Sequence, residues 1–499
     1  MSLINIQNLS FSYSSNYEQI FEDVSIQLDT DWKLGLIGRN GKGKTTFFKL
    51  LLNQLEYSGT IASKVKFEYF PLTINNKEDL VCNIVAEYLP IVEEWEIRRE
   101  MNLINLDECT YYQPFNLLSG GEQVKIMLVI LFLKENSFLL IDEPTNHLDI
   151  EGREIVSEYL NHKKGFILIS HDRRFLNNCI DHVMSINNES IKIIQGNYDT
   201  WKYEKDNQDN YEIMQNEKLK KDIKKLDISA KRNAKWSSEV EKSKNLGRAA
   251  KGGRIDQGVK PDKGHIGAMA AKMMKRSKVA QQRKDDALTE KKKLLKEIEE
   301  IEPLKIRPLI HHSKTLVEFI DVGIIYDDRI INKNINFSIQ QGDRIALMGN
   351  NGCGKTSVLK LLMNDNIQHI GQIRKAAGLK ISYVSQDTDF LKGDLKEYIE
   401  LNKLDESKFK TILRKLGFSR NQFDKKLEDY SSGQKKKVLI AKSLCEQAHL
   451  YVWDEALNYL DIISRIQLEN LLLEYQPTII FVEHDVEFCE NVATKIINL

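Results

Sequence analysis

Gly38-Arg39-Asn40-Gly41-Lys42-Gly43-Lys44-Thr45 is the stretch of sequence that decides the fold. It has the form GxxxxGK[ST]; a short apolar run, 33–37, precedes it, and a segment with helical periodicity, 45–52, follows. In that context the glycines let backbone N–H groups face a phosphate, the lysine reaches the outer phosphate oxygens and the hydroxyl binds Mg²⁺. The stretch therefore predicts a strand–loop–helix unit that holds a nucleotide.

The same stretch returns 311 positions later as 349–356, Gly-Asn-Asn-Gly-Cys-Gly-Lys-Thr. Three more segments recur with offsets of 312, 312 and 313: Leu118-Ser119-Gly120-Gly121-Glu122-Gln123 as Tyr430-Ser431-Ser432-Gly433-Gln434-Lys435, Asp142-Glu143 as Asp454-Glu455, and His171-Asp172 as His484-Asp485. Segments that keep their register over such a distance indicate a duplication. We expect two homologous domains.

Each repeat alternates short apolar runs with helical segments. Runs bounded by polar residues are typical of buried parallel strands, so each repeat is expected to be an α/β domain. The runs in question are Lys33–Ile37, Phe138–Ile141 and Phe166–Ile169 in the first repeat, and Arg344–Met348, Leu450–Trp453 and Thr478–Val482 in the second.

The composition excludes several classes of protein. The chain of 499 residues is 41% hydrophobic, enough for large cores, and no apolar run approaches the ~18 residues of a membrane span. The first residues show no secretory signal, and six scattered cysteines form no CxxC pair, so reduced thiols in a cytoplasmic protein are expected. The formal net charge is zero, with 72 basic and 72 acidic residues, which at first argues against a nucleic-acid partner.

The charge is unevenly distributed, however. Residues 218–284 hold 21 Lys and Arg against 6 Asp and Glu, a local net charge of +15. Apolar residues recur at helical spacing before Gly247 and after Gly267, and the part between is rich in glycine. We therefore predict domains at 1–201 and 309–499, joined by a basic antiparallel helical hairpin at 202–308 with helices of about 40 residues. An ordinary solvated hairpin is the alternative.

Three pairs of residues that follow apolar strands are the candidate catalytic groups. Asp142 and Asp454 would hold Mg²⁺, and the glutamates after them, Glu143 and Glu455, would polarise the attacking water. His171 and His484 would contact the γ-phosphate. Alternatively, such an Asp caps a helix, the Glu is charge at the helix start, and the His is structural.

These residues resemble ATP-binding cassette proteins over both repeats. Residues 118–123 look like the signature of that family, which contacts the nucleotide held by the opposite domain. The resemblance implies an Mg-dependent ATPase, a monomer whose two cassettes enclose two ATP molecules head to tail. Tyr13 and Tyr326 stand where the family stacks an aromatic ring on adenine; the alternative is that they are packing tyrosines.

The resemblance assigns the following site residues. ATP contacts are Tyr13, Gly38, Asn40, Gly41, Gly43, Lys44, Thr45, Thr46, Ser119, Gly120, Gly121, Glu122, Tyr326, Gly349, Asn351, Gly352, Gly354, Lys355, Thr356, Ser357, Ser431, Gly433 and Gln434. Contacts with Mg²⁺ are Thr45, Asp142, Thr356, Gln386 and Asp454.

The chain departs from the family pattern at three positions. The glutamine present as Gln386 is Leu72 in the first repeat, and Ser432 replaces the first glycine of the second signature. Both changes fall on the composite site of Lys44. Ala456 stands where the family has proline. Since Glu143 and Glu455 are both present, we expect hydrolysis with unequal sites.

Two cassettes with a helical insert resemble the ABC-F class, in which the insert meets tRNA in the ribosomal P site and the cassettes dock in the E site. Basic clusters bind nucleic acid by neutralising phosphates and releasing counterions, which supports that reading independently. The candidate tRNA- and rRNA-binding residues are Lys235, Lys242, Lys244, Arg248, Lys251, Arg254, Lys260, Lys263, Lys272, Lys275, Arg276 and Lys278.

Within that class the chain is similar to Lsa-type antibiotic-resistance factors. The 75 residues from Lys44 to Ser119 leave no room for an arm subdomain, and only 15 residues follow His484, so no C-terminal extension is expected. The segments 270–278 and 454–461 also resemble that group. The resemblance implies protection of the bacterial peptidyl transferase centre from lincosamides, pleuromutilins and streptogramin A, by displacing P-site tRNA.

Three other functions stay open. A housekeeping ABC-F factor that rescues stalled ribosomes shares the ATPase and the insert. A transporter ATPase with separate membrane subunits leaves the basic hairpin unexplained. A DNA-repair ATPase with a coiled insert ranks lowest, because such proteins usually carry much longer coils or zinc hooks.

Overall fold

The computed structural model describes residues 2–13, 19–186, 191–249, 302–326, 329–363 and 367–499, with Lys275, Gln282 and Asp286; in strands and helices, the side chains of 222–223, 226–227, 229–249, 326 and 329–331 lie outside this description. Contacts divide the chain into two units. One comprises Met1–Trp201 with Ile301–Leu499, and the other is Lys202–Glu300. The first unit contains both repeats, here called cassette 1 and cassette 2.

A large twisted sheet forms the core of cassette 1. Its strand order is β5-β6-β7-β3-β8-β9, parallel except for the antiparallel pair β8–β9. The strands are β3 Lys33–Ile37, β5 Lys66–Phe70, β6 Ser137–Asp142, β7 Phe166–Ile169, β8 His182–Ile186 and β9 Ile191–Gln195. All four residues of β7 are buried, as expected of a central parallel strand.

Cassette 2 repeats this core. Its large sheet has the order β14-β15-β16-β12-β17, and all of its pairs are parallel. The strands are β12 Arg344–Met348, β14 Ile381–Val384, β15 Leu450–Asp454, β16 Ile479–Val482 and β17 Lys495–Asn498. The predicted strands in both repeats are confirmed to within one residue at each end. The predicted α/β fold with two tandem cassettes is confirmed.

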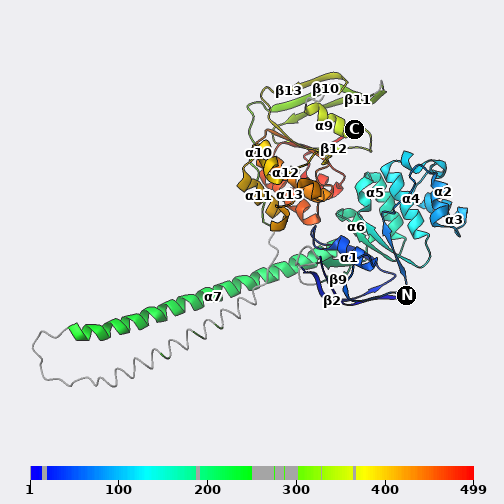
Figure 1. Cartoon of the computed structure of the whole chain (residues 1–499). Coiled ribbons are helices and arrows are strands. Elements are labelled where there is room, and N and C mark those ends of the chain that lie inside the picture. The colour runs from blue at the N-terminus through cyan, green and yellow to red at the C-terminus, as the bar shows by residue number, and fades with distance from the viewer. Residues whose placement is uncertain are drawn as a thin grey trace, which may run out of the picture. The chain divides into compact units, whose positions relative to one another are not determined.

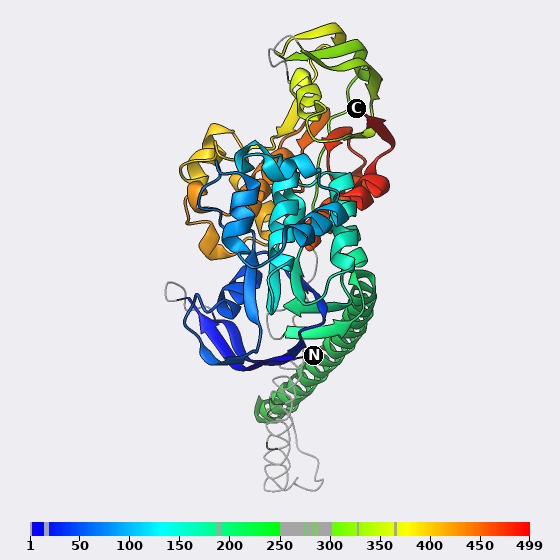
Figure 2. The same ribbon diagram turned by 90° about the vertical axis from the view of Figure 1, so that its right-hand side faces the viewer.

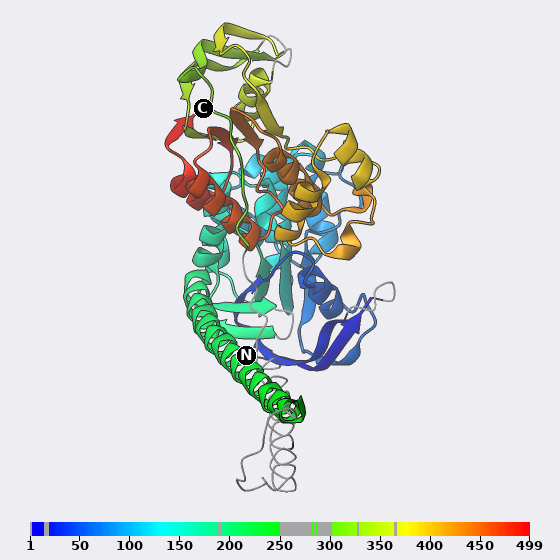
Figure 3. The same ribbon diagram turned by 90° about the vertical axis from the view of Figure 1, so that its left-hand side faces the viewer.

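Each cassette also has a small antiparallel sheet. In cassette 1 its order is β2-β1-β4, and in cassette 2 it is β11-β10-β13. The strands are β1 Leu3–Ser12, β2 Gln19–Asp29, β4 Ser58–Ala62, β10 Thr315–Tyr326, β11 Arg329–Gln340 and β13 His369–Lys375. Figure 1 shows α9 between β12 and the small sheet of cassette 2. Figure 2 and Figure 3 show the same sheet from two opposite sides, and in both views it is separated from helices α10–α12.

Helices cover the large sheets. Those of cassette 1 are α1 Lys44–Leu51, α2 Val81–Tyr88, α3 Glu94–Leu103, α4 Gly120–Phe132, α5 Ile150–Asn161 and α6 Arg173–Cys179. Those of cassette 2 are α9 Lys355–Leu362, α10 Leu395–Leu401, α11 Glu406–Lys415, α12 Ser432–Cys445, α13 Ile462–Tyr475 and α14 Val486–Val492. Short 3₁₀ turns lie at Glu108–Tyr112, Phe115–Leu117, Pro144–His147, Arg420–Gln422 and Leu427–Asp429.

The first part of the insert is one long helix, α7, at Tyr198–Ala249. It is longer than the predicted 40 residues because it begins inside cassette 1, where Tyr198 and Trp201 are buried, and because it continues through Gly247, predicted to open the loop. A glycine costs a helix only about 1 kcal/mol, so one glycine does not end it. After Ala249, the rest of the predicted insert lies outside the described residues, apart from three isolated positions and residues 302–308. Residues 302–308 form neither helix nor strand, and Leu304 and Ile306 are buried, so this end of the predicted insert packs as part of the unit that holds the cassettes. In the described part of the chain, no helix is long and apolar enough to span a membrane.

The register of the parallel strands brings the candidate functional residues to one edge of each sheet. In cassette 1, Asp142 pairs with Ile169, so the residues after β6 and β7 leave the sheet together, next to the loop after β3. In cassette 2, Asp454 pairs with Val482 in the same way. Carboxyl ends of parallel strands are the usual ligand-binding edge of such sheets.

A buried arginine joins the two cassettes. Arg173, at the start of α6, donates to Glu469 of α13 at 2.9 Å and lies 3.1 Å from Glu487 of α14. Its side chain is 3% exposed, and Glu469 also accepts from Asn491 at 2.7 Å. Breaking a buried ion pair leaves an uncompensated charge, which makes this contact costly to remove.

We expect Arg173→Met to lower the free energy of unfolding by about 3 kcal/mol, because two carboxylates lose their buried cation. The matched control is Arg174→Met, the neighbouring exposed arginine 3.3 Å from Glu154, for which a change below about 0.5 kcal/mol is expected. Urea unfolding followed by circular dichroism measures both. Equal losses in the two variants would contradict the role given to the buried pair.

Candidate functional site

Both phosphate loops hold their lysine against the loop's own backbone. Lys44 Nζ donates to the carbonyl oxygen of Gly38 at 2.5 Å and to Asn40 Oδ1 at 3.3 Å. Lys355 Nζ donates to the carbonyl oxygens of Gly349 and Asn350 at 2.7 and 2.9 Å. Both lysines are buried, and burial lowers the pKa of Lys44. Neutral carbonyls only partly stabilise a buried ammonium, so an anion suits each loop.

The loops need glycine where helices α1 and α9 begin. Gly43 and Gly354 both have φ of 95°, in the left-handed region that side chains rarely adopt. A Cβ at Gly43 would also lie 2.6 Å from Ile20 Cγ2, closer than any normal contact. Neither helix start has a side-chain cap hydrogen bond, so its backbone N–H groups are available to a phosphate.

A hydroxyl and a carboxylate meet beside each loop. Thr45 Oγ1 donates to Asp142 Oδ2 at 3.3 Å, and Thr356 Oγ1 donates to Asp454 Oδ1 at 3.3 Å. This pair is the donor set that Mg²⁺ takes in nucleotide sites. Burial raises the pKa of Asp142, and burial with the Glu455 charge raises that of Asp454 to about 6. A bound cation would offset that cost.

Sequence reasoning missed a tyrosine at each of these carboxylates. Tyr69 donates its hydroxyl to Asp142 Oδ2 at 3.1 Å, and Tyr383 donates to Asp454 Oδ2 at 3.5 Å. Each stands three residues before Leu72 or Gln386, so the repeat itself held the signal.

The two candidate catalytic glutamates share a strained backbone. Glu143 has φ of 51° and Glu455 has φ of 46°, left-handed values that cost free energy for a non-glycine residue. In both cassettes this turn comes directly after the strand ends, at Asp142 in β6 and at Asp454 in β15. Strain that occurs at matching positions in both repeats marks a functional turn.

The side chains of these glutamates have different surroundings. Glu455 Oε2 accepts from Gln386 at 2.9 Å and from Asn458 at 2.7 Å, and its Oε1 lies 3.4 Å from His484 Nε2. Glu143 Oε1 lies 3.2 Å from His171 Nε2, but the geometry is not that of a hydrogen bond. Among the described residues, Glu143 Oε1 is thus buried without a hydrogen-bond partner.

The pKa values follow these surroundings. Burial and the Asp142 charge raise the pKa of Glu143 to about 8. Burial also opposes ionisation of Glu455, but His484 and two lysines outweigh it and lower the pKa of Glu455 below its usual value. Burial lowers the pKa of His171 well below its usual value. Cassette 2 therefore offers the ionised carboxylate that can accept a proton from water.

Each signature serine caps a helix. Ser119 and Ser431 accept from the backbone N–H of Glu122 and Gln434, and each of these side chains bonds back to the serine's N–H. These capping boxes fix the signature backbone at the starts of α4 and α12.

The signature of cassette 1 and the phosphate loop of cassette 2 border one cleft of about 420 Å³. This volume lies in the range of ligand pockets. The lining comes from Gly120, Asn146, His147 and Leu148 of cassette 1 and from Asn351, Gly352, Gly354, Lys355, Thr356, Ser357, Gln386, Glu455 and His484 of cassette 2. The structure thus brings together residues that the head-to-tail arrangement predicts.

The opposite seam is in direct contact. Asn40 Nδ2 of the first phosphate loop donates to the carbonyl oxygen of Tyr459 in cassette 2 at 3.0 Å. A Cβ at Gly433 would lie 2.5 Å from that oxygen and 3.0 Å from Asn40 Nδ2. Glycine is therefore required in the second signature at this position, and Ser432 beside it begins α12.

The predicted adenine-stacking tyrosines and RNA-binding residues are described only in part. Tyr13 bonds Thr46 Oγ1 through its hydroxyl at 3.0 Å and packs edge-on against Phe11 at 4.9 Å, so its ring lies beside the first phosphate loop. The side chain of Tyr326 lies outside the described residues. Lys275 is exposed. The other predicted RNA-binding side chains lie outside the description: Lys235, Lys242, Lys244, Arg248, Lys251, Arg254, Lys260, Lys263, Lys272, Arg276 and Lys278.

Taken together, the residues present fit a magnesium nucleotide in each cassette. Lys44 and Lys355 would hold the phosphates, and the Thr–Asp pairs would hold the metal. The bound nucleotide supplies the phosphoanhydride bond that is broken. Within the chain, Glu455 and His484 would orient water, and the signature helix starts would close the sites.

Comparison with known families agrees with this geometry. Residues 21–146 and 332–458, together more than half of the chain, match the family model described as ABC transporter. The chain belongs to the ABC transporter family. It is an ATPase of that family with two ATP-binding domains, and the predicted ATPase activity is confirmed at that level.

Similar proteins cover nearly the whole chain. The ATP-binding protein Uup of Buchnera aphidicola is 28% identical over 99% of this chain and 80% of its own length. The ribosome protection protein VmlR of Bacillus subtilis is 25% identical over 99% and 86%, and the probable ATP-binding protein YbiT of Escherichia coli O157:H7 is 26% identical over 99% and 95%.

A solved structure of the archaeal ribosome recycling factor aABCE1, in complex with the stalk protein aP1, superposes with a TM-score of 0.62 at 19% identity. It covers 98% of this chain and 87% of that chain. At that identity the likeness concerns the fold alone.

We expect Glu455→Gln to lower the steady-state rate of ATP hydrolysis by about tenfold or more, and Glu143→Gln by about twofold, because only Glu455 is both ionised and held by hydrogen bonds. A phosphate-release assay at saturating ATP measures both. A larger loss of rate in Glu143→Gln than in Glu455→Gln would show that the hydrogen bonds around Glu455 do not favour hydrolysis.

Glu483 is buried beside His484, and its ionisation is expected to make the free energy of unfolding depend on pH. Its Oε1 accepts from Leu457 N at 2.9 Å, and burial raises the pKa of Glu483 to about 8. Between about pH 4.5 and 8 the folded state keeps a proton that the unfolded state loses, so this group costs stability as pH rises, up to ~1.4 kcal/mol per unit.

Glu483→Gln removes that dependence and keeps the acceptor for Leu457 N. Urea unfolding from pH 5 to 8 is expected to show wild type losing stability relative to the variant. Glu474→Gln, an exposed change on α13, is the control and should leave the wild-type profile. Parallel profiles for wild type and Glu483→Gln would be evidence against a protonated Glu483.

Proposed function

We propose that the chain is an ABC-F ATPase that protects the bacterial ribosome from antibiotics in the cytoplasm. With ATP bound, it enters the E site. The insert then displaces P-site tRNA and dislodges lincosamides, pleuromutilins or streptogramin A from the peptidyl transferase centre. The observation that carries this proposal is the similarity to VmlR, a ribosome protection protein, along 99% of the chain, insert included.

The charge distribution supports an RNA partner. The net charge of +15 in residues 218–284 lies between two cassettes that carry the balancing negative charge. A basic insert attracts rRNA and tRNA phosphates, whereas acidic cassettes reduce indiscriminate binding to RNA. A transporter subunit has no use for such an insert.

The composite cleft supports control by ATP. Gly120 of cassette 1 and Lys355 of cassette 2 line the same cleft, so a nucleotide there touches both cassettes. Contacts of that nucleotide with both cassettes favour the closed state, and hydrolysis removes these contacts so that the cassettes separate. The role proposed for ATP is therefore to set when the factor is closed and bound to the ribosome.

The double variant Glu143→Gln with Glu455→Gln is expected to bind ATP, fail to hydrolyse it and stay on ribosomes. Sucrose-gradient sedimentation with ATP measures the bound fraction, and the same variant carrying Lys44→Ala and Lys355→Ala is the control that should not bind. If the trapped variant sediments free of ribosomes, ribosome binding is refuted.

A second set of variants separates insert from cassettes. Changing Lys251, Arg254, Lys260 and Lys263 to Glu should reduce ribosome binding steeply and weaken its salt dependence, while ATPase activity without ribosomes stays unchanged. The control changes exposed cassette lysines to Glu: Lys64, Lys164, Lys392 and Lys403.

Drug susceptibility distinguishes protection from a housekeeping role. Expression in a susceptible strain should raise the inhibitory concentration of a lincosamide several-fold, and the Glu143→Gln, Glu455→Gln variant should not. Ribosome binding with unchanged susceptibility would instead assign the chain to translation factors that rescue stalled ribosomes.

A further inference from the structure

One arginine of cassette 1 contacts both walls of the cleft between the cassettes. Arg153, on the first turn of α5, is 9% exposed. Its Nε donates to the carbonyl oxygen of Leu148 at 3.2 Å, and its Nη2 donates to that of Thr145 at 3.2 Å. These bonds hold the 145–148 segment, which contributes Asn146, His147 and Leu148 to the cleft.

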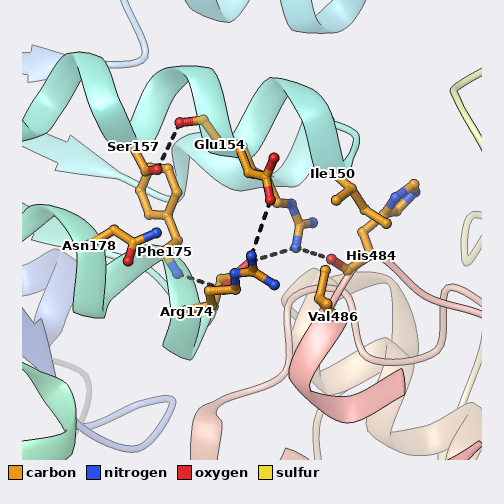
Figure 4. A pocket seen from close by; sticks show the side chains of 10 residues that line it. Ile150, Glu154, Ser157, Arg174, Phe175, Asn178, His484 and Val486 are labelled. Carbon is orange, nitrogen blue, oxygen red and sulfur yellow. Dashed lines mark hydrogen bonds and ion pairs between the residues drawn. The ribbon is translucent and has the colours of Figure 1, made fainter. Parts of the chain in front are cut away.

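The remaining nitrogen of Arg153 crosses the seam. Nη1 donates to Asp172 Oδ2 at 2.8 Å and to the carbonyl oxygen of His484 at 3.0 Å. Figure 4 shows this side of the seam, with Ile150 beside His484 and Val486 below it. A small cavity of about 20 Å³ lies there, bordered by residues of both cassettes.

The carbonyl of His484 is fixed by this bond while its ring faces the reaction site. His484 Nε2 lies 3.4 Å from Glu455 Oε1, and both residues line the cleft. One planar guanidinium therefore binds the cassette 1 wall and the cassette 2 wall of the same cleft. Such a fork has a fixed geometry that a flexible ammonium cannot reproduce.

We propose that Arg153 is a positioning residue for ATP hydrolysis in cassette 2: it links the 145–148 segment of cassette 1 to His484, so that the histidine is aligned with Glu455 only when the two cassettes are closed. The proposal rests on the roles proposed for Glu455 and His484. Arg153 acts through His484 and touches neither phosphate nor water.

The repeat supplies a matched control within the chain. Arg465 stands 312 positions later, where its Nε donates to Leu460 at 3.2 Å and its Nη1 donates to Asp485 Oδ2 at 3.1 Å. In the described part of the chain, Arg465 makes no hydrogen bond to the His171 carbonyl. The bond across the seam is thus specific to Arg153, whereas the Nε bond and the bond to the aspartate after the histidine are common to both arginines. Among the described residues, the Nη2 bond of Arg153 to Thr145 has no counterpart at Arg465.

Two backgrounds test the direction of the effect. Glu143→Gln leaves hydrolysis to cassette 2, and Glu455→Gln leaves it to cassette 1. In the Glu143→Gln background, Arg153→Met should lower kcat about tenfold with KM for ATP within about twofold, because misalignment slows chemistry more than binding. In the Glu455→Gln background it should change kcat less than about twofold.

Arg465→Met in the Glu143→Gln background should change kcat less than about threefold. Arg153→Lys keeps the charge beside Asp172 but lacks the fork, so it should reproduce the kcat loss in a variant that remains folded by circular dichroism. This keeps the test decisive if Arg153→Met does not fold.

Other outcomes have distinct meanings. Equal losses of kcat in both backgrounds, or a loss only with Glu455→Gln, would overturn the proposal, since Arg153 would then support its own cassette through Asp172. If Glu455→Gln itself leaves hydrolysis unchanged, the assignment of Glu455 fails first, and the positioning role falls with it.

Discussion

The edge where parallel strands end is the constraint on which both nucleotide sites depend. Loop, carboxylate and histidine come from three different strands, and only the in-register pairing of Asp142 with Ile169, and of Asp454 with Val482, brings them together. The residues at these strand ends carry ionisable side chains although the strands are buried there. Each site therefore holds several charged groups that are shielded from water. The cost of that shielding explains why the pKa of Asp454 and of Glu143 is raised. A magnesium nucleotide bound at the edge would offset the cost and so stabilise the site.

The two cassettes differ in the polar groups that surround their buried carboxylates. In cassette 2, Lys436 is buried on α12 and donates to the carbonyl oxygen of Ser385 at 2.9 Å, next to Gln386, which bonds Glu455. The repeat places Val124 and Leu72 at the positions of Lys436 and Gln386, so cassette 1 lacks both polar groups. The departures seen in sequence therefore extend to a whole hydrogen-bonded network, which makes cassette 2 the better organised site for hydrolysis.

The sequence predicted what the repeat and the strand pattern encode. Phosphate loops, Asp–Glu pairs and strands were found because short-range spacing determines them. Arg153 and Arg173 were missed, because their partners lie about 300 positions away and a lone arginine on a helix gives no periodic signal. The length of α7 was underestimated for a related reason: Tyr198 and Trp201 are buried by tertiary contacts, which extends the helix into cassette 1.

The contact between the cassettes is also asymmetric, because its two sides are made by different residues. Arg173 bonds Glu469 and pairs with Glu487 on one side, whereas the positions that the repeat relates to Glu469 and Arg173 are Ser157 and Val486. Those two residues border the cavity of about 20 Å³. A buried ion pair resists separation because opening leaves charge unpaired, but a serine and a valine beside a cavity offer little resistance. Separation of the cassettes is therefore less costly on the side where Arg153 contacts His484 than on the side that Arg173 holds.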